Sequence, residues 1–124
     1  MAFDWKSFIK LARTLQEQAA GEADAEALLR TALSRAYYGA FCFVRNYARE
    51  QLGFEPRNAA DDHGRLRAHL KGKRFKVAQK LDRLRQWRNE SDYADRLSFD
   101  AEAALAAAIA EADAVVALLT PRTT

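Results

Sequence analysis

The chain has 124 residues and a formal net charge of +3, and hydrophobic residues make up 49% of it. This length suits one domain over residues 1–124, and a composition with only five Gly and two Pro favours packed helices over disorder or an all-β fold. No apolar run approaches the ~20 residues of a membrane span, and the first residues lack the pattern of a signal peptide. We therefore expect no membrane association. Because Cys42 is the only cysteine, we also expect no internal disulfide and a cytoplasmic location.

The first two predicted helices are bounded by start and stop signals. Asp4 can cap a helix that begins at Trp5 and ends near Gly21, a usual stop residue. Asp24 can cap a second, long helix over residues 25–52. This helix is apolar around most of its girth, which is typical of a central bundle helix or of a helix that also contacts a second chain. Small residues favour the close approach of a neighbouring helix; they are Ala36, Gly39 and Ala40.

Three further segments have helical patterns. They are residues 62–71, residues 75 to 89 or a little beyond, and residues 100–120. Asp61 or Asp62 can begin the third helix, Asp100 suits the start of the fifth, and Pro121 ends it. The segment 91–98 is expected to be irregular. The pattern predicts an all-α bundle, and because it contains no zinc-ligand spacing and no Gly-rich phosphate loop, we expect no metal and no cofactor.

The apolar stripe of the fourth helix leads to an arginine. Val77, Leu81 and Leu84 follow one another at i, i+4 and i+7, and Arg88 is the next position on that stripe. Since an unpaired buried charge is costly, either Arg88 reaches water along its stem or it points into a polar cleft with a partner. Asp92 lies four residues on, so it can pair with Arg88 if the helix continues that far.

Half of the Lys and Arg residues lie in one stretch between Arg65 and Arg88, where Asp82 is the only acid. Such a stretch forms either a solvated helical face or a phosphate-binding surface, because clustered cations displace counterions from a nucleic-acid backbone. An acidic protein partner would suit the same stretch. The candidates for contact with nucleic acid are Arg65, Lys73, Arg74, Lys76 and Arg85.

Three motifs in order carry a resemblance to a known family. They are Ser34-Arg35-Ala36-Tyr37-Tyr38-Gly39-Ala40-Phe41, then His63, then Leu84-Arg85-Gln86-Trp87-Arg88-Asn89-Glu90-Ser91-Asp92-Tyr93. Together they resemble the HEPN family (higher eukaryotes and prokaryotes nucleotide-binding), in particular its branch of small prokaryotic proteins with SRAYY and RNxADY-like motifs. The resemblance covers nearly the whole chain. It implies an up-and-down four-helix bundle with a short additional helix, paired as a homodimer.

The resemblance also implies a site. HEPN ribonucleases place Arg, four to six residues and then His at the dimer cleft, where two copies form one metal-independent RNA-cleaving site. Here Arg88 takes the arginine position, Asn89 matches the polar residue that follows, and Tyr93 stands where a histidine is expected. An imidazole can act as base or acid at neutral pH, whereas a phenol, with an ordinary pKa near ~10, is a poor base. The site is therefore better equipped to bind RNA or a nucleotide than to cut RNA quickly. Its candidate residues are Arg88, Asn89, Asp92 and Tyr93.

Several supporting positions have two interpretations. His63 matches a histidine of the same branch, and it is either a helix-start residue with local hydrogen bonds or a replacement for the missing catalytic histidine. Arg35 either pairs with a carboxylate such as Asp92 or Glu90, or lies at the solvent edge. Tyr37 and Tyr38 either pack in the core or dimer interface, or stack on bases.

The expected function is RNA or nucleotide binding by a HEPN-like homodimer in a toxin–antitoxin or defence system, with metal-independent endoribonuclease activity left open. The alternative is a non-catalytic interaction module that docks a protein partner such as a minimal nucleotidyltransferase. The two interpretations differ at Tyr93, which is either a degraded catalytic position or a structural residue whose ring packs beside Leu97 or Phe99.

Overall fold

The computed structural model describes residues 2–121, and five helices account for most of them. The helices are α1 (Lys6–Ala19), α2 (Ala25–Gln51), α3 (Asp62–Leu70), α4 (Phe75–Tyr93) and α5 (Ala101–Leu119). Residues 2–121 contain no strand, so the all-α prediction is confirmed. In the same residues, none of the helices has the length and apolar character needed to cross a membrane.

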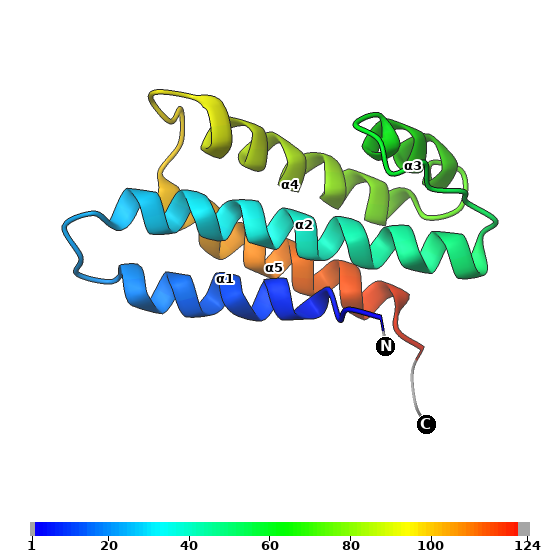
Figure 1. The fold of residues 1–124 in the computed structure, drawn as a ribbon, viewed down its shortest axis with the longest axis horizontal. Helices are drawn as coiled ribbons and strands as arrows, with labels where there is room; N and C mark the ends of the chain where they lie inside the picture. Colours follow the sequence, from blue (N-terminus) through cyan, green and yellow to red (C-terminus); the bar gives the residue numbers. More distant parts are fainter. Residues whose placement is uncertain (1, 122–124) are drawn as a thin grey trace.

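The four long helices run in alternating directions, and the short α3 lies at one end of the molecule (Figure 1). α2 packs against each of the other four helices, as its broad apolar girth predicted. α1 and α4 lie on either side of α2 and do not contact each other. An outward strip of α2 between α1 and α4 is therefore not covered by another helix.

The core consists mainly of aliphatic side chains from α2 to α5. Its largest fully buried side chains are Leu33, Val44, Leu66, Leu70, Val77, Leu81, Leu84, Leu105 and Val115. Burying one such side chain stabilises a protein by about 1.5–3 kcal/mol. The apolar stripe of α4 predicted from Val77, Leu81 and Leu84 thus faces the core.

A glycine sets the distance between α1 and α2. A Cβ atom on Gly39 would lie 2.9 Å from Ile9 Cγ1, 3.0 Å from the Trp5 carbonyl oxygen and 3.1 Å from Phe8 Cβ. A larger residue would therefore push the two helices apart, because one of the crowded atoms belongs to the backbone. This contact confirms the predicted close approach, and it brings the Phe8 side of α1 directly against α2.

Carboxylates accept backbone hydrogen bonds at the starts of α1 and α5, whereas the predicted cap of α2 is wrong; the N-cap position of α1 itself is Trp5. Asp4 Oδ1 accepts a hydrogen bond from the Lys6 amide at 3.1 Å, and Asp100 Oδ2 accepts one from the Ala103 amide at 2.9 Å. Asp24 makes no capping hydrogen bond at the start of α2. The acid in the first turn of that helix is Glu26, where a carboxylate complements the helix dipole.

α4 continues to Tyr93, so the segment 91–98 that was predicted to be irregular begins with the last turn of this helix. The Arg30 side chain of α2 contributes to this extension, because its Nη1 donates to the carbonyls of Ser91 at 3.2 Å and Ala94 at 2.6 Å. These contacts satisfy carbonyl groups that a helix end would otherwise leave unpaired. They also fix the last turn of α4 against α2.

Candidate functional site

Arg88 projects from the C-terminal part of α4 towards the outward strip of α2. Its guanidinium carbon lies 5.1 Å from the centre of the Tyr38 ring and 5.6 Å from the centre of the Tyr93 ring. The Arg88 side chain is 18% exposed. A guanidinium in this position over an aromatic ring is attracted by the ring quadrupole. Arg88 therefore lies neither in the apolar core nor freely in water.

Two polar neighbours on α4 orient the Arg88 guanidinium. Nε lies 2.9 Å from Asp92 Oδ2, but its N–H does not point at that oxygen, so the contact is an ion pair rather than a straight hydrogen bond. Nη1 donates to Asn89 Oδ1 at 2.8 Å. The predicted pairing of Arg88 with Asp92 is confirmed, because α4 remains helical through both residues. Among residues 2–121, no group accepts a hydrogen bond from Nη2, which leaves this donor for a ligand.

A second arginine continues the same row of side chains. The Arg35 guanidinium lies 4.8 Å from the centre of the Phe8 ring and 5.4 Å from the centre of the Tyr38 ring. Arginines and rings thus alternate across α1, α2 and α4. We call this row the Arg–aromatic face; it consists of Phe8, Arg35, Tyr38, Arg88 and Tyr93.

For two residues of this face, the structure does not support one of the two interpretations left open by the sequence. Arg35 has no carboxylate partner among residues 2–121, since Asp92 pairs with Arg88 and the polar contact of Arg35 is the Ser34 hydroxyl at 3.3 Å. The side chain of Tyr93 is not packed beside the following loop but is 76% exposed. Within the described residues, its hydroxyl makes no hydrogen bond. The Tyr93 ring is therefore accessible to a ligand or a partner chain.

Sequence analysis missed two residues that support this face. Arg30 holds the end of α4 through its contacts with backbone carbonyls, and it also pairs with Glu26 at 3.1 Å. Glu90 accepts hydrogen bonds from the amide and the hydroxyl of Ser98, which fixes the loop after α4. Helical periodicity does not predict that Arg30 contacts the end of α4 or that Glu90 contacts Ser98. The only sequence signal was the i, i+4 spacing of Glu26 and Arg30.

His63 is buried where α2, α3 and α4 meet. Its Nδ1 lies 2.7 Å from the Tyr37 hydroxyl, and its Nε2 lies 3.4 Å from Asp82 Oδ1. The imidazole stacks on Phe41 with ring centres 5.8 Å apart. Both ring nitrogens are thus engaged by the protein, which favours the interpretation of His63 as an interior hydrogen-bonding residue.

Burial determines the protonation of this pair. Desolvation lowers the pKa of His63, and it outweighs the hydrogen bond to Asp82, which raises that pKa. Desolvation also raises the pKa of the Tyr37 phenol well above its usual value. A neutral imidazole that accepts from Tyr37 at Nδ1 and donates to Asp82 from Nε2 satisfies both contacts. Tyr37 connects this pair to the Arg–aromatic face, because its ring centre lies 6.0 Å from the Arg88 guanidinium.

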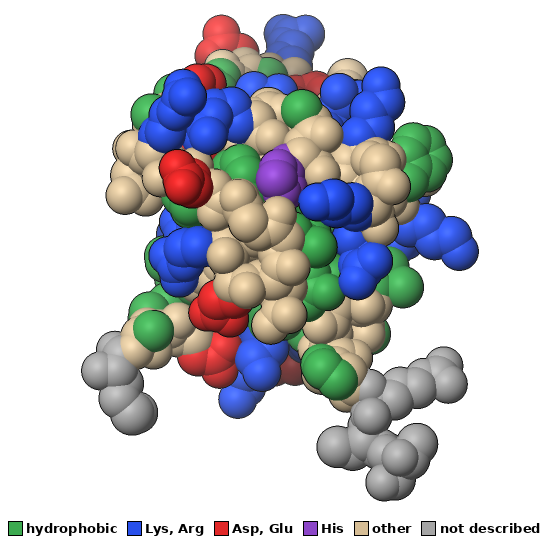
Figure 2. All heavy atoms as spheres, turned by 90° about the vertical axis from the view of Figure 1, so that its right-hand side faces the viewer, with side chains coloured by type: hydrophobic (Ala, Val, Ile, Leu, Met, Phe, Trp, Pro, Cys, Tyr) green, Lys and Arg blue, Asp and Glu red, His purple; other side chains and the backbone are tan. Residues whose placement is uncertain are grey.

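The basic candidates from the sequence surround one end of the bundle without forming a single patch. Figure 2 views this end directly and shows Lys and Arg side chains in several separate groups on its surface. Arg65 pairs with Asp62 at 3.0 Å, and Arg74 donates to the Tyr47 hydroxyl at 3.1 Å. Arg85 lines a hollow of about 470 Å³ beside His63. We call these candidates the basic end; they are Arg65, Lys73, Arg74, Lys76 and Arg85.

The candidate site consists of cations, aromatic rings and hydrogen-bonding groups. Among residues 2–121, no group of three or more His, Cys, Asp or Glu side chains is arranged to hold a metal ion. Comparison of the chain with protein-family models, with curated proteins and with solved structures finds no match to any of them.

Proposed function

We propose that the protein is a HEPN-like homodimer that binds RNA through the Arg–aromatic face, in a toxin–antitoxin or defence setting. The observation that supports this most directly is the position of Arg88. Its guanidinium lies between the rings of Tyr38 and Tyr93, and Asp92 holds it in place. A guanidinium oriented in this way can bind a phosphate, while the exposed Tyr93 ring and the open part of the half-buried Tyr38 ring can stack on bases.

The alternation of charge and ring suits single-stranded RNA. Bases are available for stacking only where they are not already stacked in a duplex, and each base–aromatic stack contributes about 1–3 kcal/mol. Arg35 extends the same arrangement towards Phe8. The face thus offers two guanidinium groups for the backbone and ring surfaces for bases.

The homodimer follows from the resemblance and from the uncovered strip of α2. A second copy that packs along the edge of this strip would bring two Arg88 residues to one cleft and leave the Arg–aromatic face open to RNA. The exposed ring of Tyr93 would then lie at the edge of that cleft. Light scattering at micromolar concentration should report twice the mass of the chain. A monomer under these conditions would contradict this part of the proposal.

Binding is a better-supported activity than cleavage. Metal-independent cleavage of RNA needs a proton-transfer group next to the cation, and the position of the expected histidine is occupied by Tyr93. His63 is buried and engaged at both ring nitrogens, so it does not present a free base at the Arg–aromatic face. We therefore expect slow cleavage or none in the wild-type protein.

One experiment tests both activities. Wild type, Arg88→Ala and the control Arg96→Ala are titrated with single-stranded RNA in the presence of chelator, and RNA cleavage is followed in parallel. Arg88→Ala should weaken binding by about ten- to a hundredfold, because a charge-assisted phosphate contact is lost. Arg96 is exposed in the loop after α4. Its substitution removes the same charge outside the face and should change the affinity by less than about threefold.

Substitution of Tyr93 separates a degraded nuclease from a binding face. Tyr93→His should create or raise metal-independent cleavage with a bell-shaped pH profile, and this activity should disappear when Arg88→Ala is added. Tyr93→Phe should keep RNA binding, because the ring remains. A Tyr93→His protein that folds, dimerises and cuts no RNA would argue against the degraded-nuclease interpretation.

The alternative is a non-catalytic module that docks a protein partner such as a minimal nucleotidyltransferase. The observation that favours it is the pairing of Arg88 with Asp92, which already neutralises the guanidinium. Under this alternative, neither Arg88→Ala nor Tyr93→His would change RNA affinity. Both substitutions would instead weaken the complex with the partner.

A further inference from the structure

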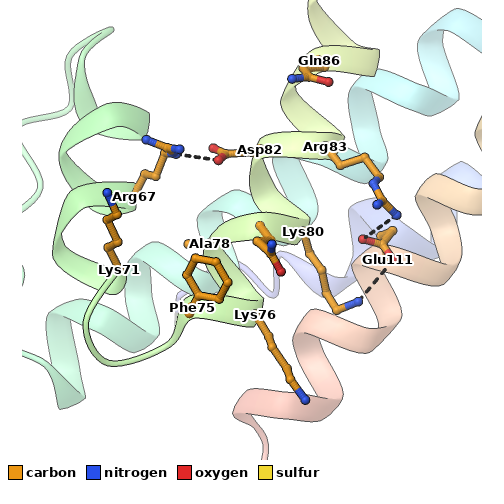
Figure 3. Close-up of a pocket in the computed structure, with 11 residues that line it drawn as sticks. Arg67, Lys71, Phe75, Lys76, Ala78, Lys80, Asp82, Arg83, Gln86 and Glu111 are labelled. Carbon is orange, nitrogen blue, oxygen red and sulfur yellow. Dashed lines mark hydrogen bonds and ion pairs between the residues drawn. The ribbon is translucent and has the colours of Figure 1, made fainter.

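A groove separate from the Arg–aromatic face lies on the other side of α4, between α3 and α5. It has a volume of about 690 Å³, and Figure 3 shows its side chains, which come from α3, from α4 and its N-terminal approach, and from α5. We call it the α3–α4 groove. Among residues 2–121, five cations and two carboxylates line it, which leaves an excess of three positive charges. The cations are Arg67, Lys71, Lys76, Lys80 and Arg83.

The two carboxylates in the groove are already engaged by cations. Glu111 of α5 is 16% exposed; its Oε1 lies 3.2 Å from Lys80 Nζ and its Oε2 lies 3.7 Å from Arg83 Nη1. Asp82 accepts a hydrogen bond from Arg67 Nε at 2.5 Å. These carboxylates therefore hold the side chains of three cations against the walls of the groove, as the dashed lines in Figure 3 mark for both carboxylates.

The other two cations, Lys71 and Lys76, are exposed, and neither has an ion-pair partner among residues 2–121. Figure 3 shows their amino groups pointing in opposite directions, with Phe75 between them. The Phe75 ring is 56% exposed. Lysines that diverge in this way do not converge on one compact anion. They suit carboxylates that lie apart on a broad surface and that have an apolar contact between them.

A hollow of opposite charge lies where the loop after α4 meets the starts of α2 and α5. It has a volume of about 450 Å³, and an apolar part of its lining consists of the buried Leu29 and the half-buried Leu97 and Phe99. Among residues 2–121, four carboxylates and one arginine line it, which leaves an excess of three negative charges. We call it the acidic hollow; its charged residues are Glu26, Asp95, Arg96, Asp100 and Glu102.

Most of the negative charge of the acidic hollow is not compensated within the chain. Glu26 pairs with Arg30 at 3.1 Å. Asp95, Asp100 and Glu102 are exposed, and none of the three has an ion-pair partner among residues 2–121. The hollow therefore complements the α3–α4 groove in charge, and it offers an apolar surface where the groove presents an exposed ring.

The groove and the hollow lie towards opposite ends of the bundle. Figure 1 shows α3 and the start of α4 at one end, and the connections α1–α2 and α4–α5 at the other. The 19 residues of α4 between them span about 28 Å. The two surfaces therefore cannot meet within one chain, but they can meet between two copies. Such a head-to-tail contact leaves one groove and one hollow free, so it continues into a ring or an open chain of copies.

We propose that a second copy of this chain docks its acidic hollow onto the α3–α4 groove. Lys71 and Lys76 pair with carboxylates at the rim of the hollow, and the Phe75 ring enters between them and contacts Leu97 and Phe99. Complementary charges fix the register of such a contact more than they add affinity, and exposed ion pairs are weak. The association is therefore expected at high protein concentration and low salt. It is separate from the symmetric homodimer and does not rest on the function proposed for the Arg–aromatic face.

Sedimentation velocity of the full chain tests the contact over a range of protein and salt concentrations. At low salt, the mean mass should rise continuously with protein concentration beyond the mass of a closed dimer. The association constant should fall by about tenfold or more between about 50 and 500 mM salt, because salt screens exposed charges. A mass that stayed constant with concentration at low salt would overturn the proposal.

Reversal of charge on either surface gives the sharpest test. Lys71→Glu/Lys76→Glu and Asp95→Lys/Glu102→Lys should each lose the concentration-dependent association, while circular dichroism and thermal unfolding confirm that both variants are folded. An equal mixture of the two variants should associate again, because the intact hollow of one meets the intact groove of the other. A mixture of folded variants that did not associate would overturn the proposal.

A matched control separates the groove from the charge of the chain. Lys6 and Lys10 are exposed on α1, which does not contact α4, so Lys6→Glu/Lys10→Glu changes the net charge equally but elsewhere. This variant should associate within about threefold of wild type. An equal loss in the two lysine variants would mean that net charge, not the groove, controls association.

Two further arms identify what occupies the groove. Phe75→Ala should weaken association by about three- to tenfold through the loss of apolar contact, and an unchanged constant would rule out the seating of the ring. Association that survived Asp95→Lys/Glu102→Lys would overturn the contact and point to a polyanion that bridges the basic ends. A Glu-rich peptide that bound the groove while the chain itself did not associate would assign the groove to another acidic protein.

The failure of this proposal is distinguishable from a failure of the proposed function. Arg88 lines neither the groove nor the hollow, so Arg88→Ala should leave the head-to-tail association unchanged. Conversely, loss of single-stranded RNA binding in Arg88→Ala would support the Arg–aromatic face whether or not copies of the chain associate through the α3–α4 groove.

Discussion

The Arg–aromatic face and the α3–α4 groove lie on two sides of the same helix, yet they hold their cations in different ways. Arg88 is 18% exposed and lies against two rings. In the groove, Arg83 is 62% exposed and reaches only a carboxylate at 3.7 Å. Contacts with rings persist at high salt, whereas exposed ion pairs are screened. Two arginines of one helix can therefore differ in exposure and in how strongly salt screens their contacts, depending on what packs around them.

The largest difference in the free energy of unfolding is expected between substitutions of two arginines, Arg30 behind the face and Arg83 in the groove. Arg30→Ala should lower the free energy of unfolding by about 2–3 kcal/mol, because it removes charge-assisted hydrogen bonds to the carbonyls at the end of α4. Arg83→Ala should cost at most about 0.5 kcal/mol, since its ion pair is exposed. Urea unfolding measures both. Equal costs would mean that the end of α4 is not held more firmly than the groove.

Two glycines test how tightly the helix surfaces around them are packed. Gly39→Ala should destabilise the protein by about 1–2 kcal/mol, because the new methyl group would crowd Ile9 and the backbone of Trp5. Gly64 of α3 has no atom within 4 Å of an added Cβ, so Gly64→Ala should stabilise the protein by up to about 1 kcal/mol through helix propensity. Thermal unfolding of the two variants should therefore shift in opposite directions. A shift in the same direction would contradict the tight packing beneath the face.

Local signals predicted much of the fold. Asp4, Gly21, Asp100 and Pro121 lie close to the observed helix ends, and the spacing of apolar residues placed the stripe of α4 in the core. Local spacing also predicted the contact between Arg88 and Asp92, since it needs only a continuous helix.

Contacts between distant segments could not be predicted in this way. Arg30 reaches carbonyls 61 and 64 positions along the chain. Phe8 and Arg35 meet only because α1 and α2 pack closely at Gly39. Helical periodicity assigns a residue to a face of its own helix but does not say which side chain of another helix lies opposite. The Arg–aromatic face is built from such contacts. Arg35, Tyr38, Arg88 and Tyr93 were considered from the sequence, but Phe8 and the row itself were not foreseen.

The salt dependence of RNA binding should distinguish the basic end from the Arg–aromatic face. Replacing Lys73, Arg74 and Lys76 together should flatten the dependence of log affinity on log salt by up to ~0.7 for each lost contact with a single-strand phosphate. Tyr38→Ala should weaken binding at every salt concentration and leave that slope unchanged, because stacking releases no counterions. Binding measured from 50 to 300 mM salt distinguishes the two effects. Affinity that ignored both salt and the triple substitution would mean that the basic end is only a solvated surface.

The smallest expected effect is a pH dependence at His63, which connects the two surfaces. Tyr37, on one side of the imidazole, lies beneath Arg88, and Asp82, on the other side, holds Arg67 of the groove. Burial lowers the pKa of His63 below the ordinary value of 6.5, so the unfolded chain takes up its proton at a higher pH than the folded protein does. The free energy of unfolding should therefore fall as the pH drops below about 6.5, until the pKa of the folded state is reached. Asp62, whose pKa is lowered by hydrogen bonds despite its burial, adds a loss only at more acidic pH.

Two glutamine substitutions test the origin of this dependence. In His63→Gln the amide can still accept from Tyr37 and donate to Asp82, but it does not titrate, so the loss of stability between pH 7 and 5 should become shallower. His69→Gln is the control, because His69 lies on the same helix and its Nε2 contacts the Leu52 carbonyl oxygen at 2.6 Å. This control replaces the other histidine by the same amide, so a change of slope seen only in His63→Gln is assigned to His63. If His63→Gln kept the full slope, a different group would be responsible, and His63 would link the Arg–aromatic face to the α3–α4 groove through packing alone.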